Sequence, residues 1–298
     1  MGKINNFFLK LFKKKSPDKP WLDYYSREER KIEFTKKSIY DYMVDEVGED
    51  RDFIALNYFE NRISYHDFLN NINICARSLR EFGVKPGDVV TICLPNMPEA
   101  IYTFYACNKI GAVADIIHPL SSPEQVKFYL QESKSRYLFL VDFNYEKLKD
   151  VLPDTLVYKT ILVSPKESMP LALSLGYTLT RSIKIKKPKI NDTSYMTWKE
   201  FKNYGLSNIR EFHANVKSND LALILHSGGT TGTPKGIMIS NYSFNAIAQQ
   251  SGVNVIDVRP KDKIVNITNI SWFWPRNLCS HSNLFKSRNH INARIRCQ

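Results

Sequence analysis

The sequence predicts an α/β protein built from repeated βαβ units, with a mostly parallel sheet that is buried on both faces. Three observations support this fold class. Several short segments are apolar along their whole length, which is typical of strands covered on both sides. Segments with helical spacing, each about a dozen residues long, alternate with those strands. Glycine, proline and serine stand where such elements would begin and end.

The regular pattern begins near residue 52. Two short strands are expected at Phe53–Tyr58 and Arg62–Tyr65. Apolar residues then recur at helical spacing from Phe68 to Phe82 and stop at Gly83, a residue type that commonly ends helices. A turn over 84–88 leads to a continuous apolar strand at 89–94.

The pattern continues with a second helix over Pro98–Ile110, which proline opens and Gly111 closes. A strand is expected at Ala112–Ile117, and Ser122, Pro123 and Glu124 form a capped helix start. Another strand is expected at 136–141. Together these elements predict consecutive βαβ units.

Residues 160–205 interrupt this rhythm, and we interpret them as a surface insertion or a connection between subdomains. Their lysines, Lys184, Lys186 and Lys187, indicate a solvated face. The longest apolar stretch away from the ends, Met169–Leu179, has about half of the roughly 20 residues needed to cross a bilayer, so no membrane span is expected. Strand character returns at Asp220–Leu225.

The net charge of +12 belongs to the two ends of the chain. Residues 1–15 hold five lysines and no acid, and residues 271–298 hold five basic residues and no acid. The remaining sequence has 32 basic and 30 acidic residues. No basic face with interleaved aromatic residues is visible, so no nucleic-acid partner is expected.

The N-terminal residues carry an amphipathic signal. Ile4, Phe7, Phe8, Leu11 and Phe12 share one helical stripe, with lysines on the other side. A weak membrane-surface contact through residues 3–15 is one interpretation; a frayed basic end, or a helix docked on its own domain, is the other. The five cysteines form no CxxC pair, and the N-terminal residues make no convincing export signal. We therefore expect a cytoplasmic location, with membrane-peripheral attachment left open.

A glycine-rich loop follows the strand at 220–225 and carries the chemistry. It reads His226-Ser-Gly-Gly-Thr-Thr-Gly-Thr-Pro-Lys-Gly236. Glycines let backbone N–H groups turn inward, hydroxyls add donors and the lysine supplies charge, so the loop suits a polyphosphate. It is not a Walker A loop, because Lys235 and Gly236 lead into an apolar strand-like run instead of a helix.

This loop resembles the signature of the adenylate-forming superfamily, which includes acyl-CoA synthetases, adenylation domains and luciferases. Upstream stretches are similar to the landmarks of that superfamily in the same order: Ile63–Tyr65, Gly83–Asp88, Leu94–Glu99 and Asn108–Val113. The resemblance covers roughly residues 35–265. The Gly228-Gly229 pair and an N-terminal extension bearing Trp21 resemble the fatty acyl-CoA ligase branch.

The resemblance implies a partial large N-terminal domain of an enzyme that uses ATP, Mg²⁺ and coenzyme A. It implies activation of a small-molecule carboxylate, with a fatty acid expected, first to acyl-AMP and then to acyl-CoA. The implied nucleotide-binding residues are Ser227, Gly228, Gly229, Thr230, Thr231, Gly232, Thr233 and Lys235. Thr230 is also the implied Mg²⁺ ligand. Asn241 stands where the family often has histidine, and no role is assigned to it. No obligate protein partner is inferred.

The sequence departs from the family after about residue 265. Residues 271–281 have no helical or strand period. One set of codons that encodes them gives a segment similar to the family when it is read from the second base. Because tryptophan has a single codon, Trp272 and Trp274 each become glycine in that shifted frame. We therefore hypothesise a frameshift between about Ile264 and Thr268, with a divergent exposed tail as the alternative.

The expected domains are a basic extension at 1–34, a partial AMP-binding domain at 35–265 and an aberrant, unstructured tail at 266–298, with the C-terminal domain absent. On this interpretation the chain is an inactive truncated form, and its catalytic residues are not identified. A carrier-protein adenylation module and a non-catalytic nucleotide-binding fragment remain alternative functions.

Overall fold

A computed structural model describes residues 32–186, 188–189, 192–227 and 234–254. The chain divides into two compact units, Met1–Phe34 and Thr35–Gln298, and the elements below belong to the second. The first elements are α2 (Ile39–Val47), β1 (Ile54–Tyr58), β2 (Asn61–Ser64), α3 (Tyr65–Glu81), β3 (Val89–Cys93), α4 (Pro98–Lys109), β4 (Val113–Ile116), α5 (Pro123–Ser133) and β5 (Tyr137–Val141). They are followed by α6 (Tyr145–Leu148), β6 (Lys159–Val163), α7 (Leu171–Thr180), the 3₁₀ turn η5 (Ser182–Lys184), β7 (Tyr195–Thr197), α8 (Trp198–Ser207), β8 (Leu221–His226), β9 (Gly236–Ser240) and α9 (Asn241–Asn254).

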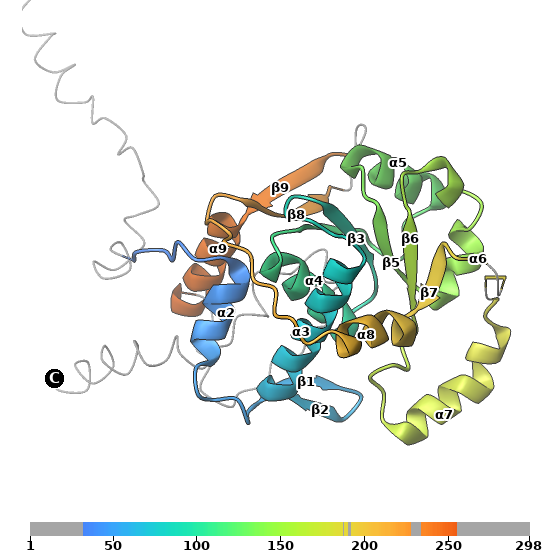
Figure 1. Ribbon diagram of the computed structural model, residues 1–298, viewed down its shortest axis with the longest axis horizontal. Helices are drawn as coiled ribbons and strands as arrows, with labels where there is room; N and C mark the ends of the chain where they lie inside the picture. Colours follow the sequence, from blue (N-terminus) through green and yellow to red (C-terminus); the bar gives the residue numbers. More distant parts are fainter. Residues whose placement is uncertain (1–31, 187, 190–191, 228–233, 255–298) are drawn as a thin grey trace, which may run out of the picture. The chain divides into compact units, whose positions relative to one another are not determined.

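The main sheet of the described residues has the strand order β7-β6-β5-β3-β4-β8-β9 (Figure 1). All neighbouring pairs are parallel except β8 and β9, which form an antiparallel edge. A separate antiparallel hairpin, β1–β2, precedes α3. The predicted α/β fold with a mostly parallel sheet is therefore confirmed.

The sheet is buried on both faces, as the apolar strands predict. In β5, Phe139 and Val141 belong to one core cluster, whereas Leu138 and Leu140 belong to the other. The first cluster also contains side chains of α2, α3, α4, α8 and α9. The second contains side chains of α5 and α6. Figure 1 shows α2 and α9, which are far apart in the sequence, side by side.

Local sequence signals mark three of the element boundaries. Gly83 and Gly111 follow α3 and α4 with φ of +82° and +77°, a left-handed conformation that favours glycine. At the start of α5, the Ser122 hydroxyl accepts from the Gln125 backbone N–H in a capping box. Each of these three boundaries agrees with the prediction from sequence.

The predicted interruption at 160–205 is too wide. Strand β6 extends the parallel sheet, with Ile161 and Val163 in the core. Helix α8 packs Trp198 and Phe201 into the same core. The irregular excursion is limited to the segment between β6 and β7. The prediction was too wide because the Ser/Pro-rich and basic composition of that segment obscured the short core elements on each side of it.

Candidate functional site

The glycine-rich loop connects β8 to β9 as a hairpin at one edge of the sheet. The last paired residues on either side are His226 and Gly236. Because β8 runs parallel to β4, the loop leaves the sheet at the edge where the parallel strands have their carboxyl ends. The predicted strand after Gly236 is confirmed as β9.

Two of the predicted site residues, Ser227 and Lys235, close the base of this loop. The backbone N–H of Ser227 donates to the carbonyl oxygen of Lys235 over 3.0 Å. The Ser227 hydroxyl accepts from the Lys235 backbone N–H over 3.2 Å and lies 3.3 Å from its carbonyl oxygen. The Ser227 side chain thus holds the two ends of the loop together, a role that the sequence did not predict.

Lys235 is exposed and has no ion-pair partner among the described residues. A side-chain cation at the base of the loop is therefore available to an anionic ligand. The other predicted site residues, Gly228, Gly229, Thr230, Thr231, Gly232 and Thr233, lie outside the described residues.

A buried polar group supports the strand end from which the loop begins. Nε2 of His226 lies 2.6 Å from Oδ1 of Asp115, and their side chains are 5% and 0% exposed. Oδ2 of Asp115 accepts from the Thr91 hydroxyl over 2.8 Å. The Tyr129 ring stacks on the His226 ring with centroids 3.9 Å apart. A buried carboxylate is costly unless it is paired, so the folded state is stabilised while Asp115 keeps these partners. The contacts therefore hold His226 beside β4.

The chain connections diverge next to this strand end. After β3 the chain passes to α4, whose side chains join the core cluster on one face of the sheet. After β4 it passes to α5, whose side chains join the cluster on the other face. In open α/β sheets, ligands bind outside the carboxyl ends of strands where successive connections take opposite faces. The loop after β8 lies next to β4 and is thus close to such a point.

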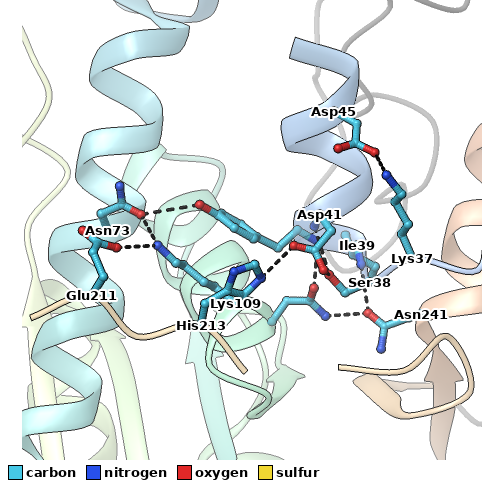
Figure 2. Close-up of polar contacts among 12 residues, drawn as sticks. Lys37, Ser38, Ile39, Asp41, Asp45, Asn73, Lys109, Glu211, His213 and Asn241 are labelled. Carbon is cyan, nitrogen blue, oxygen red and sulfur yellow. Dashed lines mark hydrogen bonds and ion pairs between the residues drawn. The ribbon is translucent and has the colours of Figure 1, made fainter. Parts of the chain in front are cut away.

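Asn241, for which no role was predicted, is a buried junction of the fold (Figure 2). Its Oδ1 accepts from the Ile39 backbone N–H over 3.0 Å and from the Asn108 amide over 2.7 Å. Its Nδ2 donates to the carbonyl oxygen of Asp220 over 3.0 Å. Asn241 therefore ties the start of α9 to α2, to α4 and to the turn before β8.

The polar network of Figure 2 continues across neighbouring elements. Lys109 Nζ lies 2.6 Å from Asn73 Oδ1 and 3.0 Å from Glu211 Oε2. His213 Nε2 lies 2.7 Å from Asp41 Oδ1. Within the described residues, no group of three or more His, Cys, Asp or Glu side chains is placed to hold a metal ion.

A cavity of about 480 Å³ is lined by residues of β2, α3, α4 and α8 and by Glu167 and Ser168, and by none of the described residues of the glycine-rich loop. Glu99 lines it and is 1% exposed. Oε1 of Glu99 accepts from the Ser168 hydroxyl over 2.6 Å, while Oε2 has no hydrogen-bond partner in the described part of the chain. Burial raises the pKa of this carboxyl to about 7.

Comparison with known proteins identifies a family and several relatives that match most of the chain. Residues 44–285 match the family model described as AMP-binding enzyme. The chain is 22% identical over 251 residues to a long-chain-fatty-acid–CoA ligase of Bacillus subtilis, covering 84% of this chain and 45% of the relative. It is 27% identical over 216 residues to an acetyl-coenzyme A synthetase of Helicobacter pylori, covering 71% of this chain and 31% of the relative.

A solved structure shows the same fold. A long-chain-fatty-acid-CoA ligase from Archaeoglobus fulgidus superposes with a TM-score of 0.63 at 21% identity, covering 88% of this chain and 46% of that one. The chain thus spans less than half the length of each of these three proteins.

Proposed function

We propose a function for this chain from one premise: the chain belongs to the AMP-binding enzyme family. The proposed reaction is the ATP-dependent, AMP-forming activation of a carboxylic acid. A carboxylate oxygen attacks the α-phosphorus of ATP, the bond from that phosphorus to the bridging oxygen breaks, and pyrophosphate leaves. The thiol of coenzyme A then loses its proton to solvent, its thiolate sulfur attacks the acyl carbonyl carbon of acyl-AMP, and AMP leaves with the electron pair.

The observation that carries this proposal is the closed hairpin loop at the carboxyl edge of the sheet. Its ends are joined through Ser227 and Lys235, and the Lys235 ammonium is free of acidic partners in the described part of the chain. We assign this cation to the β- and γ-phosphates of ATP, with the backbone and hydroxyl groups of residues 227–233 as further donors. Such electrostatic positioning is most of what nucleotidyl transfer asks of a protein.

The proposed role of Mg²⁺ is to neutralise the phosphate charge. Magnesium is usually held by one or two protein oxygens together with substrate phosphates and water. The hydroxyl of Thr230 is our candidate protein ligand. With the Thr230 hydroxyl as its one protein ligand, the metal would take its remaining ligands from phosphate oxygens and water.

A fatty acid is the proposed substrate class. This assignment rests on the Gly228-Gly229 pair, on Trp21 in the N-terminal extension and on the relative named a long-chain-fatty-acid–CoA ligase. A cytoplasmic location is also proposed; in the described part of the chain, Cys75, Cys93 and Cys107 are free and buried. A carrier-protein adenylation module and a non-catalytic nucleotide-binding fragment are the competing functions.

Carboxylate-dependent exchange of pyrophosphate into ATP tests the proposal. It is measured on the 298-residue chain and on a version continued in the shifted reading frame after about residue 265. We expect exchange with fatty acids only in the continued version. Exchange in neither version, with ATP still bound, would favour the non-catalytic fragment. Transfer to a carrier protein but not to coenzyme A would favour the adenylation module.

A further inference from the structure

Helix α7 carries its leucines on the outside. Leu171, Leu175 and Leu179 follow one another at four-residue steps and are 77%, 55% and 72% exposed. Ile183 in η5 is also exposed. In contrast, the half-buried residues of α7 are Ser174, Tyr177 and Thr178, and the Thr178 hydroxyl accepts from Lys166 Nζ over 3.2 Å. This arrangement is the reverse of an ordinary surface helix, which turns its apolar stripe toward the core.

The helix is attached at its base and lies at the periphery of the fold (Figure 1). The segment before it is held by the β1–β2 hairpin, since Tyr58 Oη donates to the Pro165 carbonyl oxygen and Asn61 Nδ2 to that of Ser168. No residue of α7 is buried, and η5 is the only described element with which α7 makes extensive contact. The outward stripe is therefore uncovered in the described part of the chain.

Cations follow the apolar stripe directly. The segment from Ser168 to Asn191 contains five basic residues and no acidic one: Arg181, Lys184, Lys186, Lys187 and Lys189. Lys186 pairs with Glu146 over 2.9 Å. Arg181 and Lys184 are exposed and have no ion-pair partner among the residues that the structure describes.

We propose that α7 and the two exposed cations after it, Arg181 and Lys184, bind a membrane surface of anionic phospholipid. The leucine stripe would enter the boundary between headgroups and acyl chains, and Arg181 and Lys184 would contact the phosphates. With ten residues, α7 is suited to lying in the interface. A second copy of this chain is a poorer occupant, because it would bring identical clusters of cations together. This inference does not depend on the proposed ligase activity.

Sedimentation of the full chain with vesicles tests the proposal. We expect binding to vesicles of equal parts phosphatidylglycerol and phosphatidylcholine, and weak binding to phosphatidylcholine alone. The combined change Leu171→Ser, Leu175→Ser and Leu179→Ser should lower the partition coefficient on anionic vesicles by at least about 10-fold. Arg181→Gln and Lys184→Gln should each lower it about 5-fold, and on phosphatidylcholine they should have little effect.

Two controls separate α7 from other apolar surfaces. Leu120→Ser and Leu156→Ser remove leucines that are 76% and 59% exposed elsewhere, and they should leave binding unchanged. Phe7→Ser with Phe8→Ser tests the N-terminal stripe, and most of the binding should survive. The proposal is overturned if the triple leucine variant binds like the wild type, if only the Phe7 and Phe8 changes abolish binding, or if the leucine changes instead dissociate a dimer.

Discussion

Asp115 is the residue on which the base of the glycine-rich loop depends. It is fully buried and holds both Thr91 and His226. We predict that Asp115→Ala lowers the free energy of unfolding by about 3–5 kcal/mol, because it leaves two buried polar partners unpaired. Asp115→Asn retains an oxygen acceptor and should cost less. Denaturant unfolding measures both.

The matched control for Asp115 is Asp154→Ala. Asp154 pairs with Lys127 over 2.6 Å, but its side chain is 61% exposed. An exposed ion pair contributes up to about 1 kcal/mol. Equal losses of stability for Asp115→Ala and Asp154→Ala would contradict the role given to the buried pair.

Asn241 is a second buried polar residue on which the stability of the fold should depend. Replacement by alanine removes the hydrogen bonds to Ile39, Asn108 and Asp220 at one buried position. We predict a loss of about 2–4 kcal/mol in the free energy of unfolding. Asn70→Ala, at an exposed position of α3, is the control and should be neutral or slightly stabilising because alanine favours helix. A stable Asn241→Ala variant would mean that the junction of α2, α4 and α9 holds without it.

Glu99 predicts a pH dependence of stability. Burial raises the pKa of its carboxyl from 4.5 to about 7, so the folded state retains a proton that the unfolded state releases. The stabilising contribution is thus present below about pH 4.5 and is lost as the pH rises to about 7. We predict that Glu99→Gln stabilises the protein by about 2–3 kcal/mol at pH 8 relative to its effect at pH 4.5.

Denaturant unfolding at these two pH values checks the Glu99 prediction. Burial also raises the pKa of Glu46 to about 7, so some pH dependence should remain in the Glu99→Gln variant. Glu132→Gln changes an exposed carboxylate of α5 and serves as the control. If the Glu99→Gln and wild-type curves run parallel between pH 4.5 and pH 8, the buried carboxyl does not titrate as described.

At the scale of elements, the close contact between α3 and α8 depends on Gly205. A Cβ at this position would lie 2.0 Å from the Ile74 carbonyl oxygen, and the Gly205 backbone N–H donates to the Ser78 hydroxyl over 2.9 Å. Gly205→Ala must therefore separate the two helices, and we predict a loss of about 1–3 kcal/mol in the free energy of unfolding.

Gly176 in α7 gives the opposite expectation. Nothing lies within 4 Å of a Cβ built there, and alanine favours helix over glycine by about 1 kcal/mol. Gly176→Ala should therefore raise the free energy of unfolding slightly. Thermal and denaturant unfolding of both variants measure these effects. An unchanged free energy of unfolding in Gly205→Ala would contradict the described packing of α3 against α8.

Sequence pattern predicted the βαβ units because each of their strands is apolar on both faces and each helix has a local start or stop signal. It did not predict β6 and α8 as core elements, since a Ser/Pro-rich and basic segment lies between them. The inverted orientation of α7 was also not predictable. Composition marks its residues as apolar, but only the packing of Ser174 and Thr178 toward the protein shows which face is exposed.

The candidate site, like the fold, was predictable from sequence only in part. The residue types of the loop predicted a phosphate-binding function, and the position of the loop between two strands is confirmed. The support from Asp115 was not predicted, because an aspartate inside an apolar strand gains its partners, Thr91 and His226, only when neighbouring strands come into register. Asn241 was missed for the same reason: its partners are distant in the sequence.

For the whole molecule, the chain spans less than half the length of the three relatives compared above. None of the described helices is long and apolar enough to cross a membrane. The hypothesised frameshift and the aberrant tail at 266–298 lie outside the described residues. The part that the structure does describe carries a complete base for the glycine-rich loop, so the central claim is testable on this chain.

The most direct test of that claim is the affinity for ATP in the presence of Mg²⁺, measured by titration calorimetry with AMP as the comparison ligand. If Lys235 contacts the β- and γ-phosphates, Lys235→Ala should weaken ATP binding by about 10- to 150-fold, a loss of about 1.5–3 kcal/mol, and leave AMP binding unchanged. Lys217→Ala, at an exposed lysine before β8, should change neither affinity. Undiminished binding of ATP to the Lys235→Ala variant would contradict the assignment of this loop to the phosphates.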